Sequence, residues 1–316
     1  MKKNTFLIFD GTNVFIRSFS GLMRQGLTAP NGEGTWGAFG AYNVVSNMIR
    51  KYEPSHVLIA FDKGRSSKRL LIDPEYKANR KKDDEAPRNA MDEAFQLEYK
   101  PQMSIFMHLC LKSGIPFIRI DNVEADDVIS TAALSFAPVF DQVVIVSADH
   151  DMQQLIRNNI IVVKPSISYK DIQEERYTTE TIMAEWGVEP WRLPEIWALT
   201  GDRGDNIKGI RGIGPKKATK MIAEYGNLET LLASDDPKII DNIEIVRKAY
   251  SLIELGIDES IPLPPLGDLQ FNPIKPDDCD AGDLEQLYDS LGFLQIKDRW
   301  KKNSLWSDGP QFGRRL

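Results

Sequence analysis

The feature that most constrains the fold is a pattern repeated along the first 150 residues, in which a short apolar run is followed by aspartate. The runs 5–9, 56–61 and 143–146 are followed by Asp10, by Asp62, and by Asp149 with Asp151. Short apolar runs that alternate with helical patterns predict a mostly parallel sheet flanked by helices. Because the carboxyl ends of parallel strands meet at one edge of a sheet, we expect these aspartates to converge.

A second acidic group lies between two of these strands, at the start of a helix. Glu124, Asp126 and Asp127 occupy its first turn, where the helix dipole favours negative charge, so a capping role alone would explain them. A capping role does not explain why these residues are expected at the same edge of the sheet as Asp149 and Asp151. Carboxylates crowded in one crevice repel each other unless a cation binds them, and oxygen ligands suit magnesium or manganese. We therefore predict a divalent-metal site.

Two neighbours of these carboxylates are given other roles. An aspartate after a strand is more often a helix cap than a ligand, so Asp10 alone is weak evidence for metal. Asn13 is expected to cap the following helix, 14–22. His150 is interpreted as an exposed neighbour, because alternation directs it away from Asp149 and Asp151.

The rest of the chain continues with further strands and helices. We predict strands at 117–120 and 160–164, and helices at 36–52, 89–99, 103–113, 179–186, 215–224, 228–233, 237–255 and 284–291. The proline-rich segment 262–276 is expected to be a loop that wraps over the core. These elements favour an α/β core at 1–185, a helical region at 186–300 and a loose tail at 301–316.

The segment 199–225 combines acidic, glycine-rich and basic sequence. Asp202 and Asp205 are three residues apart, close enough for one metal ion. Gly209, Gly212 and Gly214 predict a hairpin between two helices, which exposes backbone N–H groups to an anion. Basic residues expected to face phosphate surround this hairpin: Lys208, Arg211, Lys216, Lys217 and Lys220.

A second basic segment follows Asp62 and leaves two interpretations open. Residues 79–104 are mostly charged or polar, which fits a solvated excursion with a helical middle. The same composition fits a basic element that closes over a nucleic-acid strand, with Lys81 and Lys82 on its surface and Tyr76 stacking on a base.

Composition limits the class of protein. The net charge of −7 and the pI of about 5.2 argue against nucleic acid as a ligand, but bound metal would offset the clustered acidic residues. Cys110 and Cys279 have no zinc-type spacing and are expected to be reduced thiols. The apolar run 6–9 is too short for a signal peptide or a membrane span, so a cytoplasmic location with no membrane partner is expected.

Taken together, these motifs resemble the flap endonuclease and 5′-to-3′ exonuclease family, which includes phage flap nucleases and the N-terminal nuclease domain of bacterial DNA polymerase I. The likeness covers about the first 225 residues and, more loosely, 284–293. The motifs that carry it are 10–13, 61–62, 76–80, 123–127, 147–151, 201–206 and 209–214.

The resemblance implies a PIN-like nuclease core and a site for two Mg²⁺ (or Mn²⁺) ions. The implied ligands are Asp10, Asp62, Glu124, Asp126, Asp127, Asp149, Asp151, Asp202 and Asp205. Lys77 and Arg80 match a basic pair that polarises the scissile phosphate, on the side away from the metals. The segment from about 76 to 104 matches a helical arch over the 5′ single strand. The hairpin matches a helix–hairpin–helix element, and a K⁺ ion at 206–214 is left open.

The expected activity is structure-specific 5′ nuclease cleavage of DNA with a 5′ flap, a nick or a 5′ single-stranded arm, leaving 5′-phosphate and 3′-hydroxyl. Catalytic roles are expected for Asp10, Asp62, Lys77, Arg80, Asp149 and Asp151. RNA–DNA hybrids are left open as substrates, and a monomer is expected. The alternatives are a non-catalytic DNA-binding module and, less compatible with the hairpin, a small metal-dependent ribonuclease. A third alternative is a polymerase fragment, although the length leaves no room for the polymerase part.

Overall fold

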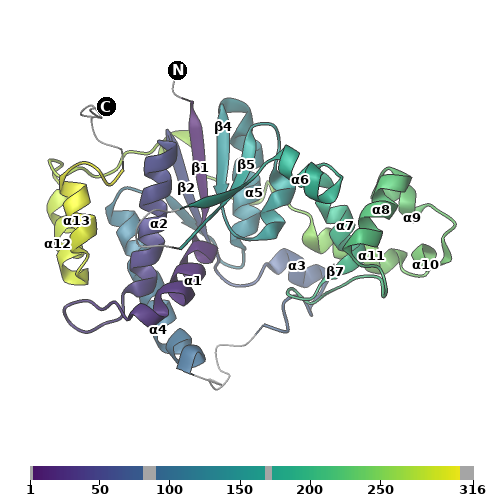
Figure 1. Cartoon of the computed structure of the whole chain (residues 1–316), viewed down its shortest axis with the longest axis horizontal. Helices are drawn as coiled ribbons and strands as arrows, with labels where there is room; N and C mark the ends of the chain where they lie inside the picture. The colour runs from purple at the N-terminus through teal and green to yellow at the C-terminus, as the bar shows by residue number, and fades with distance from the viewer. Residues whose placement is uncertain (1–2, 81–89, 168–172, 307–316) are drawn as a thin grey trace, which may run out of the picture.

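The protein is built on a six-stranded sheet, seen here in a computed structural model that describes residues 3–80, 90–167 and 173–306. The strand order is β3-β2-β1-β4-β5-β6. The strands are β1 Thr5–Asp10, β2 His56–Phe61, β3 Phe117–Arg119, β4 Gln142–Val146, β5 Ile160–Pro165 and β6 Glu174–Tyr177. Strands β1 to β5 are parallel, and β6 is antiparallel to β5. The predicted α/β fold is confirmed (Figure 1).

Helices cover both faces of the sheet, and β1 shows why. Its side chains alternate, so Phe6 and Ile8 pack with α5 (Ala125–Phe136) in one core. Leu7 and Phe9 pack in a second core with α1 (Gly11–Leu22), α2 (Trp36–Tyr52) and α4 (Ala90–Lys112). All four of these β1 side chains are fully buried. The carboxyl edge of the sheet therefore lies between two layers of packed helices.

The helices after β6 pack in two places. The helices α6 Thr179–Trp186, α7 Leu193–Thr200, α8 Pro215–Tyr225, α9 Leu228–Leu232, α10 Pro237–Ile240 and α11 Ile243–Ile253 extend the first core. Helices α12 (Ala281–Leu291) and α13 (Leu294–Lys301) pack in the second core, at the opposite end of the molecule (Figure 1). The predicted region 186–300 is thus divided in space. None of the described helices is long and apolar enough to cross a bilayer.

Several elements differ from the predictions because tertiary packing overrides local signals. Helix α4 is continuous through Pro101, where two helices were expected. The helix expected at 237–255 is two helices, α10 and α11. Three short strands were not predicted: β6, β7 (Gly201–Asp202) and β8 (Ile207–Lys208). Leu305, which falls in the predicted loose tail, is fully buried, and residues 307–316 lie outside the described ranges.

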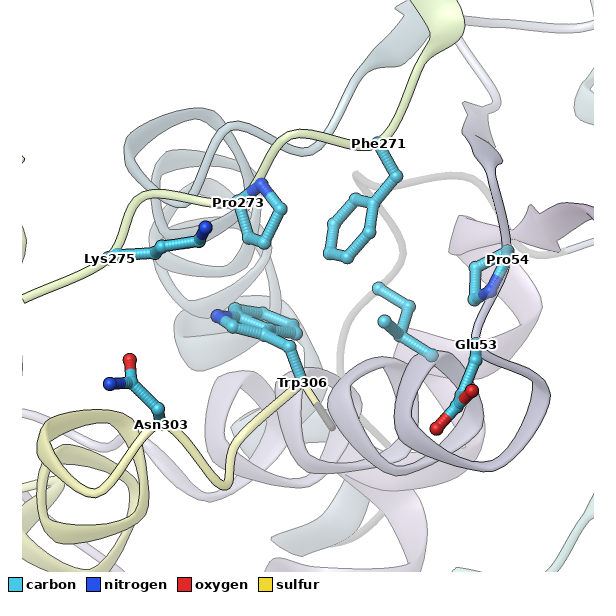
Figure 2. A pocket seen from close by; sticks show the side chains of 8 residues that line it. Glu53, Pro54, Phe271, Pro273, Lys275, Asn303 and Trp306 are labelled. Atoms are coloured by element: carbon cyan, nitrogen blue, oxygen red, sulfur yellow. The ribbon is translucent and has the colours of Figure 1, made fainter. Parts of the chain in front are cut away.

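The proline-rich segment, which was expected to wrap over the core, packs on the amino edge of the sheet. The Phe271 N–H donates to Ser55 O (2.9 Å), and the Ile274 N–H donates to Ser113 O (3.2 Å). The resulting pocket has a volume of about 440 Å³. Figure 2 shows the side chains that line it. The pocket is lined by Ile49, Glu53, Pro54, Phe271, Pro273, Lys275, Asn303 and Trp306. Pro54 precedes β2, so this pocket lies at the edge opposite the strand-end aspartates.

Candidate metal centre

Asp10 ends β1 and is fixed by two hydrogen bonds. Its Oδ1 accepts from the Asn13 N–H (2.9 Å), so Asp10 caps α1, and the prediction that Asn13 is the cap is wrong. Its Oδ2 accepts from Ser147 Oγ (2.8 Å), just after β4. The Asn13 Oδ1 accepts from the Ala148 N–H (3.0 Å), which binds the loop after β4 to α1. Asp10 therefore lies between neighbouring strands, at the point where the strand order reverses.

The turn after β1 requires glycine. A Cβ at Gly11 would lie 2.6 Å from Ile59 Cγ2 and from an aromatic carbon of Phe61, both on β2. Asp62 follows that strand. Its N–H donates to Thr12 Oγ1 (2.9 Å), and its Oδ1 accepts from the Ala125 N–H at the start of α5 (2.7 Å). The close packing of these turns brings Asp62 and the acidic end of α5 together.

The strand-end carboxylates and Asp126 act on each other electrostatically. Burial, with the charges of Asp62 and Asp149, raises the pKa of Asp10 to about 7. Burial also raises the pKa of Asp126 well above its usual value, and so do Asp10, Asp149 and Asp62. Burial is again the main cause of the raised pKa of Asp62. These four carboxyl groups, Asp10, Asp62, Asp126 and Asp149, form one acidic group, in which Asp10 is buried and the other three are partly exposed.

A second group adjoins it through Asp149. Burial is the main cause that raises the pKa of Asp151 to about 7, and the charges of Asp149 and, more weakly, of Asp202 and Asp205 contribute to that rise. Ligand atoms of Asp151, Asp202 and Asp205 all lie within 4.8 Å of one another. Such a set of oxygen donors, which destabilise each other when ionised, fits Mg²⁺ or Mn²⁺.

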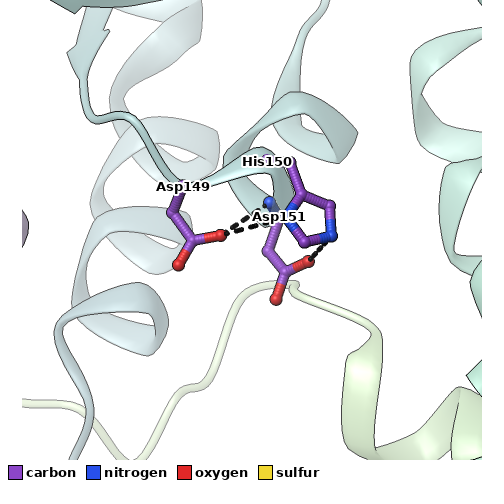
Figure 3. A group of neighbouring side chains, drawn as sticks. All are labelled: Asp149, His150 and Asp151. Atoms are coloured by element: carbon purple, nitrogen blue, oxygen red, sulfur yellow. Dashed lines mark hydrogen bonds and ion pairs between the residues drawn. The ribbon is translucent and has the colours of Figure 1, made fainter. Parts of the chain in front are cut away.

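His150 lies beside both neighbouring carboxylates. Its side chain is exposed, as predicted, but it does not point away from them. Nε2 lies 3.3 Å from Asp151 Oδ1, and Nδ1 lies 3.7 Å from Asp149 Oδ1 (Figure 3). The reason is local: residues 150–155 form a 3₁₀ helix capped by Asp149, so the alternation of an extended strand does not apply.

The segment 73–80 joins Asp205 and Glu124 to basic side chains. Lys77 Nζ lies 2.9 Å from Glu124 Oε1 and 3.5 Å from Asp205 Oδ2, and Arg80 also pairs with Asp205. The Lys77 N–H donates to Asp205 O (2.9 Å) from a left-handed backbone, φ 54°, which is rare for this residue type. Both cations are therefore against the carboxylates rather than on a separate side.

Tyr76 does not fit the predicted stacking role. Its side chain is buried, and its hydroxyl donates to Glu124 Oε2 (2.9 Å). A base has no access to such a ring. Lys81 and Lys82, and the predicted arch residues up to 89, lie outside the described ranges, while 90–104 form the N-terminal part of α4.

Asp127 points out of the acidic group, contrary to its expected role as a ligand. Arg69 on α3 (Ser67–Ile72) holds it in a two-point ion pair of 2.7 and 2.9 Å. The same guanidinium donates to Glu124 Oε2 (3.2 Å) and to Leu252 O on α11 (2.9 Å). The sequence gives no signal for this role of Arg69, because its acidic partners are more than fifty residues away along the chain.

The hairpin at 207–214 forms between α7 and α8, as predicted. Ile207, Ile210 and Ile213 are buried, and a Cβ at Gly209 would lie 2.2 Å from the Thr200 carbonyl carbon. Glycine is therefore required there. The basic side chains around it are all exposed: Lys208, Arg211, Lys216, Lys217 and Lys220.

Three further residues that shape the site were missed as contributors. Ser147 and Thr12 hold Asp10 and Asp62, and Trp197 packs against His150. The sequence did offer a signal for the first two, because a hydroxyl side chain lies beside each acidic motif: Thr12 after Asp10, and Ser147 before Asp149. Trp197 had no such signal, because its contact is made only in the folded chain.

Comparison with known families agrees with this geometry. Residues 5–187 match the family model for the 5′-3′ exonuclease N-terminal resolvase-like domain, and residues 188–277 match that for the 5′-3′ exonuclease C-terminal SAM fold. The chain belongs to the 5′-3′ exonuclease family. The predicted resemblance is thereby confirmed.

Known members of the 5′-3′ exonuclease family differ in length. A 5′-3′ exonuclease of Aquifex aeolicus is 30% identical over 304 residues, covering 94% of both chains. DNA polymerase I of Mycobacterium bovis is 30% identical over 317 residues, covering 98% of this chain and 33% of the relative. The chain thus spans about a third of the polymerase relatives that it matches.

A solved structure shares the fold. The bacteriophage T5 flap endonuclease, in a pseudo-enzyme–product complex with DNA and metal ions, matches with a TM-score of 0.65. The match is 21% identical in sequence and covers 95% of this chain and 98% of that one.

Proposed function

We propose that this chain is a metal-dependent, structure-specific 5′ nuclease with 5′-3′ exonuclease and flap endonuclease activity on DNA. The observation that carries the proposal is the joined acidic group, in which carboxylates from distant segments raise the pKa of Asp10, Asp126 and Asp151. Family membership and the exposed basic hairpin support the nucleic-acid substrate.

The proposed site consists of two groups of carboxylate ligands and one pair of basic side chains. Asp10, Asp62, Asp126 and Asp149 form one end of the metal centre, and Asp151, Asp202 and Asp205 form the other. A pair of Mg²⁺ or Mn²⁺ ions, when bound, supplies a nucleophilic water and stabilises the leaving oxygen. Cleavage in this way leaves a 5′-phosphate and a 3′-hydroxyl.

Lys77 and Arg80 are the cations nearest to that centre. Ion pairs with Glu124 and Asp205 hold these two side chains at the rim of the centre. Their positive charge there would stabilise the negative charge that develops on the scissile phosphate. Glu124 is assigned to this positioning network rather than to the ligands, because Lys77, Tyr76 and Arg69 already surround its carboxylate.

The hairpin is proposed to hold the duplex through its phosphates. Its N–H groups and exposed basic side chains suit an anion of any base sequence, which gives selectivity for structure. A K⁺ ion at 206–214 would strengthen that contact. We assign the enzyme, as a monomer, to flap, nick and 5′-arm processing in DNA replication and repair, and the cytoplasmic location stays a prediction.

The test is cleavage of a 5′-flap and a nicked duplex, with and without an RNA primer, in Mg²⁺ and in chelator. We expect cleavage of the 5′ strand in Mg²⁺ only, with products that a ligase can seal. A chain that binds these substrates but leaves them intact in both Mg²⁺ and Mn²⁺ would instead be a DNA-binding module.

A further inference from the structure

His150 places an imidazole between two carboxylates of the metal centre. One nitrogen atom of His150 and one carboxylate oxygen from each of Asp149 and Asp151 lie mutually within 4.8 Å. The His150 side chain is 59% exposed, so an ion from solvent can reach it. Figure 3 shows the ring turned toward Asp151 from the same 3₁₀ helix.

The ring is held in that place by packing. Trp197 on α7, itself buried, meets the imidazole edge-to-face, with ring centroids 5.1 Å apart at 83°. An exposed histidine normally samples several rotamers. Here one side of the ring is occupied by indole and its nitrogen atoms remain beside the carboxylates, which is the arrangement a metal ligand needs.

We propose that His150 is a nitrogen ligand, making the Asp149–Asp151 end of the centre selective for Zn²⁺ and Co²⁺ over Mg²⁺. The Nε2–Oδ1 separation of 3.3 Å to Asp151 matches the edge of a tetrahedron with bonds of about 2.0–2.1 Å. Imidazole suits zinc, cobalt and nickel, whereas magnesium prefers oxygen ligands. The inference rests on the proposed metal centre and adds a ligand that the family resemblance did not assign.

The test is calorimetric titration of the full chain, without DNA, with ZnCl₂, CoCl₂ and MgCl₂. All proteins carry Cys279→Ser, because an exposed thiol can itself bind zinc and would add to the measured binding. The variants are His150→Gln and, as the matched control, His108→Gln at an exposed histidine of α4. The visible absorption of bound Co²⁺ reports nitrogen coordination independently of affinity.

We expect His150→Gln to weaken Zn²⁺ and Co²⁺ binding about 10-fold or more, the scale of losses from altered metal surroundings, and to shift the Co²⁺ spectrum. Mg²⁺ affinity stays unchanged, and His108→Gln changes neither affinity nor spectrum. Equal Zn²⁺ and Co²⁺ binding by His150→Gln, with normal Mg²⁺ binding, overturns the role of His150 alone. If the parent protein binds none of the three ions, the proposed metal centre itself fails.

Discussion

Asp149 adjoins both acidic groups of the metal centre. Its charge therefore acts on carboxylates of both groups. Its Oδ1 caps the 3₁₀ helix by accepting from the Asp151 N–H (3.0 Å). Its charge raises the pKa of Asp10, Asp126 and Asp151. An asparagine at this position keeps the cap and removes the charge, which separates structure from metal binding.

Asp149→Asn is expected to lower single-turnover cleavage by on the order of 10²-fold or more, because a metal ion contributes several kcal/mol to the transition state. Duplex affinity is retained. In chelator the variant should unfold at an equal or higher temperature than the parent, since repulsion is relieved. The charge-matched control is Asp283→Asn on α12. Unchanged cleavage would remove Asp149 from the metal centre.

Arg69 and Asp127 make a second residue-scale prediction. Their side chains are 6% and 14% exposed, so removing only one partner leaves a buried charge. Arg69→Met should lower the free energy of unfolding by about 3–5 kcal/mol, as in other buried pairs. Adding Asp127→Leu should recover much of that loss. Urea unfolding of the parent, both single variants and the double variant measures the coupling, and additive effects would contradict it.

These two sites show what residue patterns can and cannot predict. The strand-end positions of Asp10, Asp62 and Asp149 follow from the topology of a parallel sheet, and the sequence alone places them together. The outward turn of Asp127 depends on Arg69, a residue on another helix. The burial of Tyr76 depends likewise on Glu124, and neither contact has a signal in spacing.

At the scale of elements, long periodic segments were predicted well and short or interrupted ones were not. Helix α2 and strand β2 have the predicted bounds. Helix α4 continues through Pro101 because the following turns, with Phe106 and Leu109, are fully buried against α2 and its neighbours. Strand β6, with the sequence Glu-Glu-Arg-Tyr, has no apolar alternation and pairs only because β5 offers a free edge.

The hairpin yields a prediction at this scale. Lys216→Ala with Lys217→Ala should weaken duplex binding and reduce the slope of log affinity against log salt by about 2, one unit per phosphate contact. Single-turnover cleavage at saturating enzyme should stay close to the parent. Fluorescence anisotropy over a range of salt concentrations measures the slope.

The matched control removes the same charge at the far end of the molecule. Lys301→Ala with Lys302→Ala changes α13 and its end, where the two side chains pair with Glu285 and Asp298. We expect no change in the salt slope. Equal slopes for the two double variants would show that the hairpin does not contact phosphate.

At the scale of the whole molecule, stability depends on pH through the acidic group. The pKa of Asp10 and of Asp151 rises from 3.8 to about 7 on folding. A raised carboxyl pKa stabilises the fold fully below pH 3.8, and this contribution is lost as pH rises through about 7. The metal-free protein should therefore lose thermal stability between pH 5.5 and 8.

Metal binding should reverse that loss, because the ions bind the ionised carboxylates. The increase in melting temperature on adding Mg²⁺ or Mn²⁺ should be larger at pH 8 than at pH 5.5. Scanning calorimetry at both pH values, with chelator and with metal, measures it. An increase that is independent of pH would show that the ions bind elsewhere.

The division of the helical region also belongs to this scale. Sequence order suggested one unit from 186 to 300, but α12 and α13 return to the core formed by α1, α2 and α4. Composition could not indicate this division, because the apolar faces of α11 and α12 look alike in the sequence. Only the folded structure shows that the two helices pack against different cores.

The most direct test of the account is anomalous diffraction from crystals soaked in MnCl₂. We predict two manganese peaks about 4 Å apart, as in two-metal sites, bonded to carboxylate oxygens from the groups of Asp10 and Asp151. Manganese peaks only at other positions, in a protein that Mn²⁺ activates for cleavage, would contradict the claim that the strand-end carboxylates share the catalytic ions.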